Sequence, residues 1–71
     1  PARPWRAAGA DAVARARRAI DELPSPHAEV LLLRDVLGLD PTEAGTILGM
    51  APERLRGIRH EARQALAALM A

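Results

Sequence analysis

The sequence predicts an all-α protein, a compact four-helix domain with a C-terminal helix-turn-helix. Its 71 residues suffice for one domain at most. It has one Trp and no Phe or Tyr, so the core must be aliphatic, which suits helix packing better than a sheet. Pro and Gly residues also divide the chain into segments whose apolar residues recur at helical spacing.

The first ten residues differ from the rest of the chain. Residues 1–10 contain two Pro, one Gly and Trp5, which is typical of an arm or linker, and leave residues 11–71 as the domain. The first helix is expected near 11–22, because apolar residues recur there at helical spacing: Val13, Ala16, Ile20 and Leu23. Its three Arg, at positions 15, 17 and 18, each have an acidic residue four positions away, so a solvated face is favoured over a DNA patch.

The second helix is expected near 26–37 and should be the central, most buried one. Ser25 is a natural N-cap, Pro26 suits the first turn, and Gly38 ends the helix. Its predicted apolar stripe is Ala28, Leu31, Leu32 and Val36, broadened by Val30, Leu33 and Leu37.

The third and fourth helices are expected near 41–48 and 52–69. Asp40 and Glu43 are spaced as a capping box with Pro41 between them. Gly49 closes the short helix, whose inward residues should include Ile47. The stripe of the fourth helix is Leu55, Ile58, Ala62, Leu66 and Leu69.

The last two helices meet the steric demands of a helix-turn-helix. One helix must cross closely over the other, which requires a small residue, and Gly45 stands there. Four positions later the turn requires a residue that tolerates positive φ, and Gly49 supplies it. A generic helical hairpin is the alternative, but a short helix, a Gly turn and a basic helix together favour DNA binding.

Charge supports this interpretation only mildly. The net charge is +1 and every basic residue is an Arg. The basic excess lies in residues 52–64, which hold four Arg and two Glu.

Several segments resemble region 4 of sigma-70 family RNA polymerase sigma factors, particularly the extracytoplasmic-function type. The resemblance covers residues 19–66, and its most specific part runs from Leu23-Pro24 to Glu29-Val30-Leu31-Leu32-Leu33-Arg34-Asp35-Val36. It continues through Gly38-Leu39-Asp40-Pro41-Thr42-Glu43, Ile47-Leu48-Gly49-Met50 and Ala62-Arg63-Gln64-Ala65-Leu66. The resemblance implies binding to the promoter −35 element in transcription initiation, contact with the β flap of core RNA polymerase, and a possible anti-sigma factor as partner. Residues 1–10 would then be the end of a linker from region 2.

The fourth helix departs from the family pattern at Gly57, Ile58 and Glu61. These replacements favour an alternative, a sigma-like interaction module that docks an anti-sigma factor or polymerase with little DNA binding of its own. A response-regulator helix-turn-helix is a third possibility, which the run from Leu23 to Asp35 fits poorly.

The candidate DNA-binding residues are Arg54, Arg56, Arg59, His60, Arg63 and Thr42. Arg56 is expected to contact a base edge, because a guanidinium pairs bidentately with guanine. Arg54 and Arg59 should lie on the flanks, near phosphates. Two of these residues have an alternative interpretation. His60 could contact a phosphate or a base, or be a plain exposed residue. Thr42 could help to bind a phosphate at the helix N-terminus, or belong to a structural cap.

The residue inventory argues against an enzyme. The chain has no Cys, Tyr or Lys, and His27 and His60 lie on different predicted helices, so we expect no metal site and no cofactor. No apolar run reaches the length of a membrane span and no signal peptide is visible, so a cytoplasmic location is expected.

Overall fold

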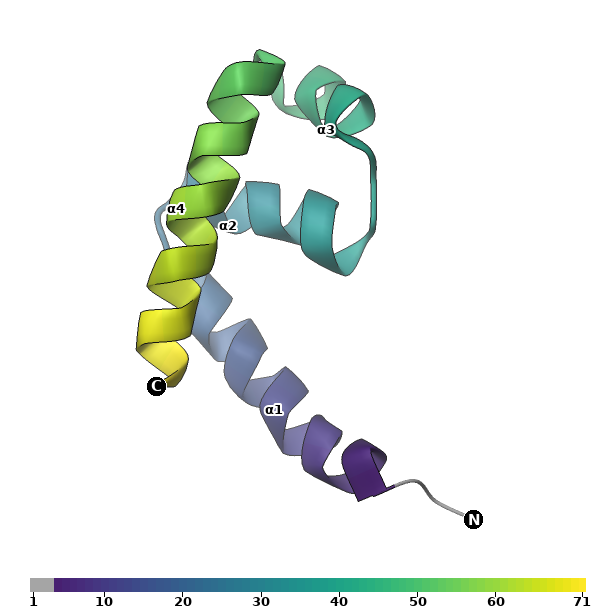
Figure 1. The fold of residues 1–71 in the computed structure, drawn as a ribbon, viewed down its shortest axis with the longest axis vertical. Helices are drawn as coiled ribbons and strands as arrows, with labels where there is room; N and C mark the ends of the chain where they lie inside the picture. Colours follow the sequence, from purple (N-terminus) through teal and green to yellow (C-terminus); the bar gives the residue numbers. More distant parts are fainter. Residues whose placement is uncertain (1–3) are drawn as a thin grey trace.

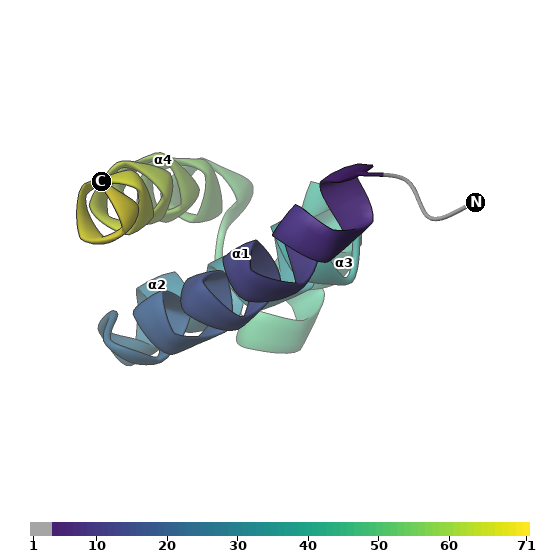
Figure 2. The same ribbon diagram turned by 90° about the horizontal axis from the view of Figure 1, so that it is seen from below.

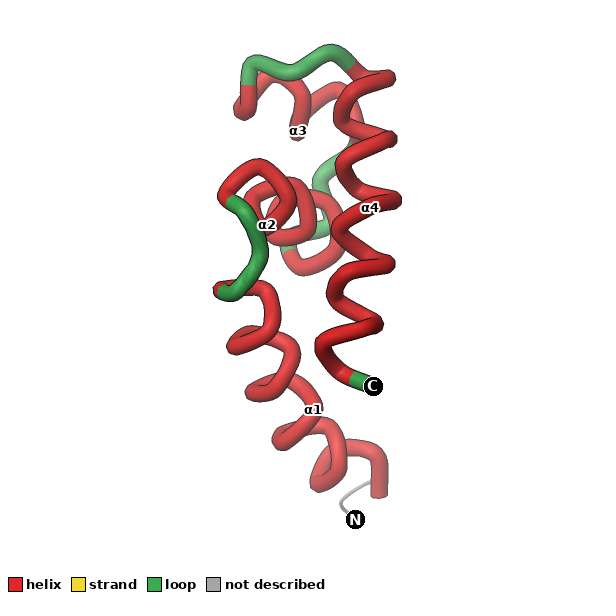
Figure 3. Tube along the Cα trace, turned by 90° about the vertical axis from the view of Figure 1, so that its left-hand side faces the viewer, coloured by secondary structure: helices red, strands yellow, loops and turns green. Residues whose placement is uncertain are grey.

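The chain folds into helices joined by short turns. The computed structural model describes the backbone of residues 4–71 and the side chains from Asp11 onward. In chain order the elements are α1 (Pro4–Asp21), α2 (Ser25–Leu31), the π-helical turn η1 (Leu32–Val36), α3 (Pro41–Leu48) and α4 (Pro52–Met70). No strand occurs between residues 4 and 71, which confirms the predicted all-α class (Figure 3).

The helices pack in two layers that measure 43 × 25 × 15 Å overall. Figure 1 shows α2 and η1 crossing behind α4, with α3 at one end of the molecule and α1 extending toward the other. Seen from below, α4 lies on one side and α1 and α2 on the other (Figure 2). Because α4 contacts α1, α2 and α3, it ties the other helices together.

The hydrophobic core lies where α2, η1, α3 and α4 meet. It consists of Val30, Leu33, Ala44, Leu55 and Ile58, bordered by Leu39, Leu48 and Met50. Leu31 is also buried, with 1% of its surface exposed, which confirms its predicted inward position. Ile47, in contrast, is 62% exposed. The prediction for Ile47 was wrong because the short α3 buries only the narrow side that carries Ala44.

Helix α1 begins at Pro4, whereas the sequence predicted a start near Asp11. Pro is well tolerated in a first helical turn, and the Ala-rich segment that follows has high helix propensity. Among the side chains of α1 from Asp11 onward, Ala19 is 5% exposed, whereas Val13, part of the predicted apolar stripe, is 55% exposed. The side chain of Trp5 lies outside the described residues.

The second predicted helix, 26–37, is divided into α2 and η1. In η1 the Leu37 N–H donates to the Leu32 carbonyl, five residues back, at 2.9 Å. This wider turn changes the angular positions of the residues that follow it. As a result Leu32 and Val36 are 46% and 57% exposed, although both were predicted to face the core.

Particular residues shape the turn before α2 and the turn after η1. Pro24, with an extended ψ of 149°, precedes α2, and no side chain caps the helix, so Ser25 is its first residue and not its N-cap. After η1, Gly38 adopts a left-handed φ of 73°. The Arg34 Nη1 donates to the Leu39 carbonyl at 2.6 Å and secures the chain that leads to α3.

Among the described residues, no helix is both long and apolar enough to cross a membrane.

Candidate nucleic-acid interface

Helices α3 and α4 form the helix-turn-helix predicted from the sequence. Helix α3 ends where Gly49 adopts a left-handed conformation, φ 63° and ψ 39°, and α4 begins at Pro52. A Cβ on Gly45 would lie 2.7 Å from the carbonyl oxygen of Met50. The small residue at position 45 is therefore required, but the close approach is to the backbone of the turn and not to α4 as expected.

Helix α4 is anchored along one side, which leaves the other side in solvent. Leu55, Ile58 and Ala62 are 1%, 8% and 0% exposed, and α4 packs through this stripe against α2 and α3. The exposed residues between positions 53 and 64 are Glu53, Arg54, Arg56, Gly57, His60, Glu61, Arg63 and Gln64. Residues 53–64 of α4 therefore present a largely polar face next to the turn.

Three of the predicted contact residues lie on this face without a protein partner. Arg54, Arg56 and His60 are exposed, and within the described part of the chain none of them forms a side-chain hydrogen bond or ion pair. Arg56 and His60 are four residues apart, so they lie one above the other on the helix surface. The structure thus brings these three side chains to one accessible surface.

The other two arginines of α4 turn toward the protein itself. The Arg59 Nη2 donates to Asp35 Oδ1 at 2.5 Å, and both side chains are 27% exposed. Arg63 Nε lies 3.7 Å from Asp35 Oδ2, with 61% of the Arg63 side chain exposed. Arg59 thus lies at the edge of the exposed face with its guanidinium bound to a carboxylate of η1, and its contact with a phosphate stays a prediction.

The hydrogen bond from Arg59 to Asp35 stabilises the charged guanidinium. It raises the pKa of Arg59 above its ordinary value, since a hydrogen bond to a carboxylate favours the charged form of the guanidinium. Arg59 is therefore a cation that forms an ion pair with Asp35.

Thr42 is exposed in the first turn of α3, at a helix end that already has its own cap. Asp40 Oδ1 accepts from the Glu43 N–H at 2.8 Å, and Glu43 Oε1 accepts from the Asp40 N–H at 3.3 Å. The capping box predicted from the sequence is thereby confirmed. Because the Asp40 carboxylate occupies the position that a phosphate would take, the capping interpretation of this helix end is favoured over a phosphate site.

The same contact changes the acidity of Asp40. The Glu43 N–H that binds its carboxylate lowers the pKa of Asp40 below the ordinary value, and Arg34 contributes in the same direction.

Asp35 was not singled out from the sequence. It stands 24 residues before Arg59, so no local spacing connects the two, and only the packing of η1 against α4 brings them together. Nothing else marked it out, because Glu29 is a second acid in the same predicted helix.

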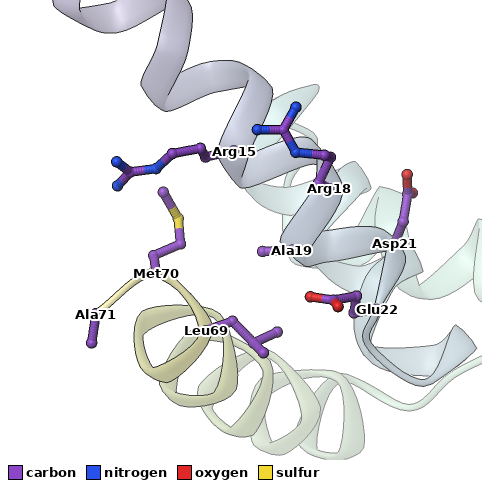
Figure 4. Close-up of a pocket in the computed structure, with 8 residues that line it drawn as sticks. All are labelled: Arg15, Arg18, Ala19, Asp21, Glu22, Leu69, Met70 and Ala71. Atoms are coloured by element: carbon purple, nitrogen blue, oxygen red, sulfur yellow. The ribbon is translucent and has the colours of Figure 1, made fainter.

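A hollow of about 700 Å³ lies away from the helix-turn-helix, between α1 and the C-terminal end of α4. Figure 4 shows Arg15 and Arg18 on one wall, Asp21 and Glu22 further along it, and Leu69 and Met70 opposite. Its charges are mixed and its walls are open, which suits neither a catalytic site nor an anion site. Among the described residues no three His, Asp or Glu side chains gather as metal ligands would.

A smaller hollow lies beside the polar face of α4, where α2 begins. Its lining includes His27, Arg54, Gly57 and Glu61. The His27 Nδ1 is buried and has no hydrogen-bond partner in the protein.

Comparisons with models of known protein families, with curated proteins and with solved structures found no match for this chain.

Proposed function

We propose that this chain binds the −35 element of promoter DNA through α4 and contributes to transcription initiation as region 4 of a sigma factor. The observation that carries the proposal is the solvent-facing group of Arg54, Arg56 and His60, held next to a turn that two glycines shape. A helix of this kind enters the major groove with its first turns against base edges. The role would place the protein in the cytoplasm and requires no cofactor or catalytic residue.

The mixed charge of α4 is compatible with weak DNA binding that a second DNA-binding region supplements. Glu53 and Glu61 share the exposed face with the arginines and would repel phosphates. In a sigma factor, a second DNA-binding region raises the effective concentration of region 4 at the promoter. A modest affinity of the isolated domain is therefore compatible with the proposed role.

The test is fluorescence anisotropy with a −35-like duplex and a scrambled duplex of the same composition. Replacing a base-contacting arginine costs about 1–3 kcal/mol of binding free energy and relaxes specificity at one position, which we expect for Arg56→Ala. Arg15→Ala, a matched change on α1, serves as the control. If Arg56→Ala binds both duplexes as the parent does, α4 does not contact bases.

A specific observation also supports the docking function as a second candidate. A groove of about 370 Å³ lies between the C-terminal part of α1 and the α2–η1 pair. Its apolar residues are Ile20, Ala28, Leu32 and Val36, and its charged residues are Arg17, Asp21 and Glu29. Exposed apolar side chains along a groove favour a protein partner, and an amphipathic helix is a common occupant of such grooves. The partner that the resemblance implies is the polymerase β flap.

Substitution separates this docking role from DNA binding. Val36→Asp puts a charge in the groove, whereas Val13→Asp makes the same change at an equally exposed site outside it. Docking at the groove predicts that only Val36→Asp abolishes binding of a β-flap fragment, while both variants bind DNA as the parent does. If a purified anti-sigma factor alone responds to Val36→Asp, that factor is the occupant.

A further inference from the structure

The carboxylate of Asp35 contacts two arginines of α4 at once. Arg59 and Arg63 are four residues apart and lie on the same side of the helix. Arg59 Nη2 is 2.5 Å from Asp35 Oδ1 and Arg63 Nε is 3.7 Å from Oδ2. One negative charge therefore faces two positive charges at the boundary between η1 and α4.

The two arginines are held to different degrees. Arg59 is 27% exposed and has a buried Nε, so its guanidinium lies within the protein surface. Arg63 is 61% exposed and its contact is longer, so it can still reach outward. The π-helical geometry of η1 determines where Asp35 projects, since a wider turn moves the residues after it around the helix axis.

We infer that Asp35 is a positioning residue which withholds Arg59 from the DNA and so limits the number of phosphates that α4 neutralises. The inference rests on the proposed function. It divides the arginines of α4 into an available set, Arg54, Arg56 and the largely exposed Arg63, and a withheld one, Arg59. Withholding it leaves the sequence preference unchanged, because a phosphate contact strengthens binding to all sequences equally.

The salt dependence of DNA binding measures this effect. Each neutralised phosphate contributes about 0.9 to the slope of log affinity against log salt concentration. In Asp35→Asn the released Arg59 should add about 0.9 to the slope. Between about 50 and 200 mM salt, that variant should lose roughly 3.5-fold more affinity than the parent. The ratio of its affinities for the −35-like and scrambled duplexes should stay unchanged.

Two further variants complete the test. Asp11→Asn makes the same chemical change on an exposed part of α1 and should leave the slope as in the parent. Arg59→Gln alone should also leave the slope unchanged, because Arg59 does not reach a phosphate while Asp35 holds it. In the Asp35→Asn background, Arg59→Gln should return the slope to the parent value.

Several outcomes would overturn the inference. It fails if Asp35→Asn and Asp11→Asn show equal slopes, or if Arg59→Gln alone already flattens the slope. Circular dichroism establishes that each variant folds, and if Asp35→Asn does not fold, the Arg59→Gln result decides. If the parent binds neither duplex, the proposed function and this inference fall together. If it binds and only the expected slope changes are missing, this inference alone falls.

Discussion

Gly45 and Met50 hold the turn of the helix-turn-helix together through their backbones. The Met50 N–H donates to the Gly45 carbonyl at 2.9 Å, and a Cβ on Gly45 would approach the Met50 carbonyl oxygen to 2.7 Å. Because both sides of this contact are main chain, no change of side-chain rotamer can relieve a clash.

Gly45→Ala should therefore destabilise the fold. Overpacking a close contact costs about 1–3 kcal/mol. Gly57→Ala is the matched comparison, since a Cβ there meets nothing within 4 Å and Ala is favoured over Gly inside a helix by about 0.5–1 kcal/mol. Urea denaturation should move the two midpoints in opposite directions. Equal shifts would show that position 45 is not crowded.

Leu31→Ala should reduce the free energy of unfolding by about 2–5 kcal/mol, because it empties a fully buried site. Leu31 is 1% exposed, whereas Leu37, also close to the α2–η1 pair, is 59% exposed. Leu37→Ala should change the stability by no more than about 0.5 kcal/mol. Thermal denaturation of the two variants is the measurement, and similar melting temperatures would contradict the burial of Leu31.

The capping box predicts a specific loss of stability in acid. The pKa of Asp40 is lower in the folded chain than in the unfolded one, so its contribution is present above the unfolded value of about 3.9 and is lost as the pH falls through the folded value. Asn caps a helix as well as Asp does but does not titrate. The melting temperature of Asp40→Asn should therefore fall less than that of the parent below about pH 4. Asp11→Asn should follow the parent, and identical curves for all three would exclude a role for Asp40.

Glu61→Arg should strengthen DNA binding. Glu61 is exposed on the polar face of α4, so the change removes a repelled carboxylate and supplies a cation for one phosphate, which steepens the salt slope by about 0.9. Glu22→Arg carries the same charge change on α1 and is the control. The measurement is an anisotropy titration of both variants. Equal gains in affinity would indicate a general attraction of the added positive charge to DNA, and would contradict a direct contact between α4 and the DNA.

Local signals in the sequence were sufficient for α3 and for the turn. Asp40, Pro41 and Gly49 each act on their immediate neighbours, and both the bounds of α3 and its cap agree with the prediction. The start of α1 was predicted too late, because Pro4 and Gly9 suggest an arm although a first-turn Pro and an isolated Gly are both tolerated in helices. The end of a helix is therefore hard to predict where Pro or Gly occurs at a position that a helix can tolerate.

Long-range packing was beyond the sequence pattern. Leu32 and Val36 fit an inward stripe at regular helical spacing, but the spacing changes within η1. The pairing of Asp35 with Arg59 depends on the same change and on contact between distant segments. Arg56 and His60 were placed correctly on the exposed face, since the opposite stripe of α4 is regular, and Arg54, predicted for the flank, is exposed as well.

The π-helical turn also affects how this chain compares with others. A π-helical turn has the length of an α-helical turn with one extra residue, so a related chain with a regular helix here would be one residue shorter between Leu32 and Val36. An alignment would need a single-residue gap inside a continuous helix, a place where gaps are seldom allowed. A one-residue deletion in η1 should preserve the helical hydrogen bonds, whereas the same deletion in α4 would rotate every following residue of its buried stripe.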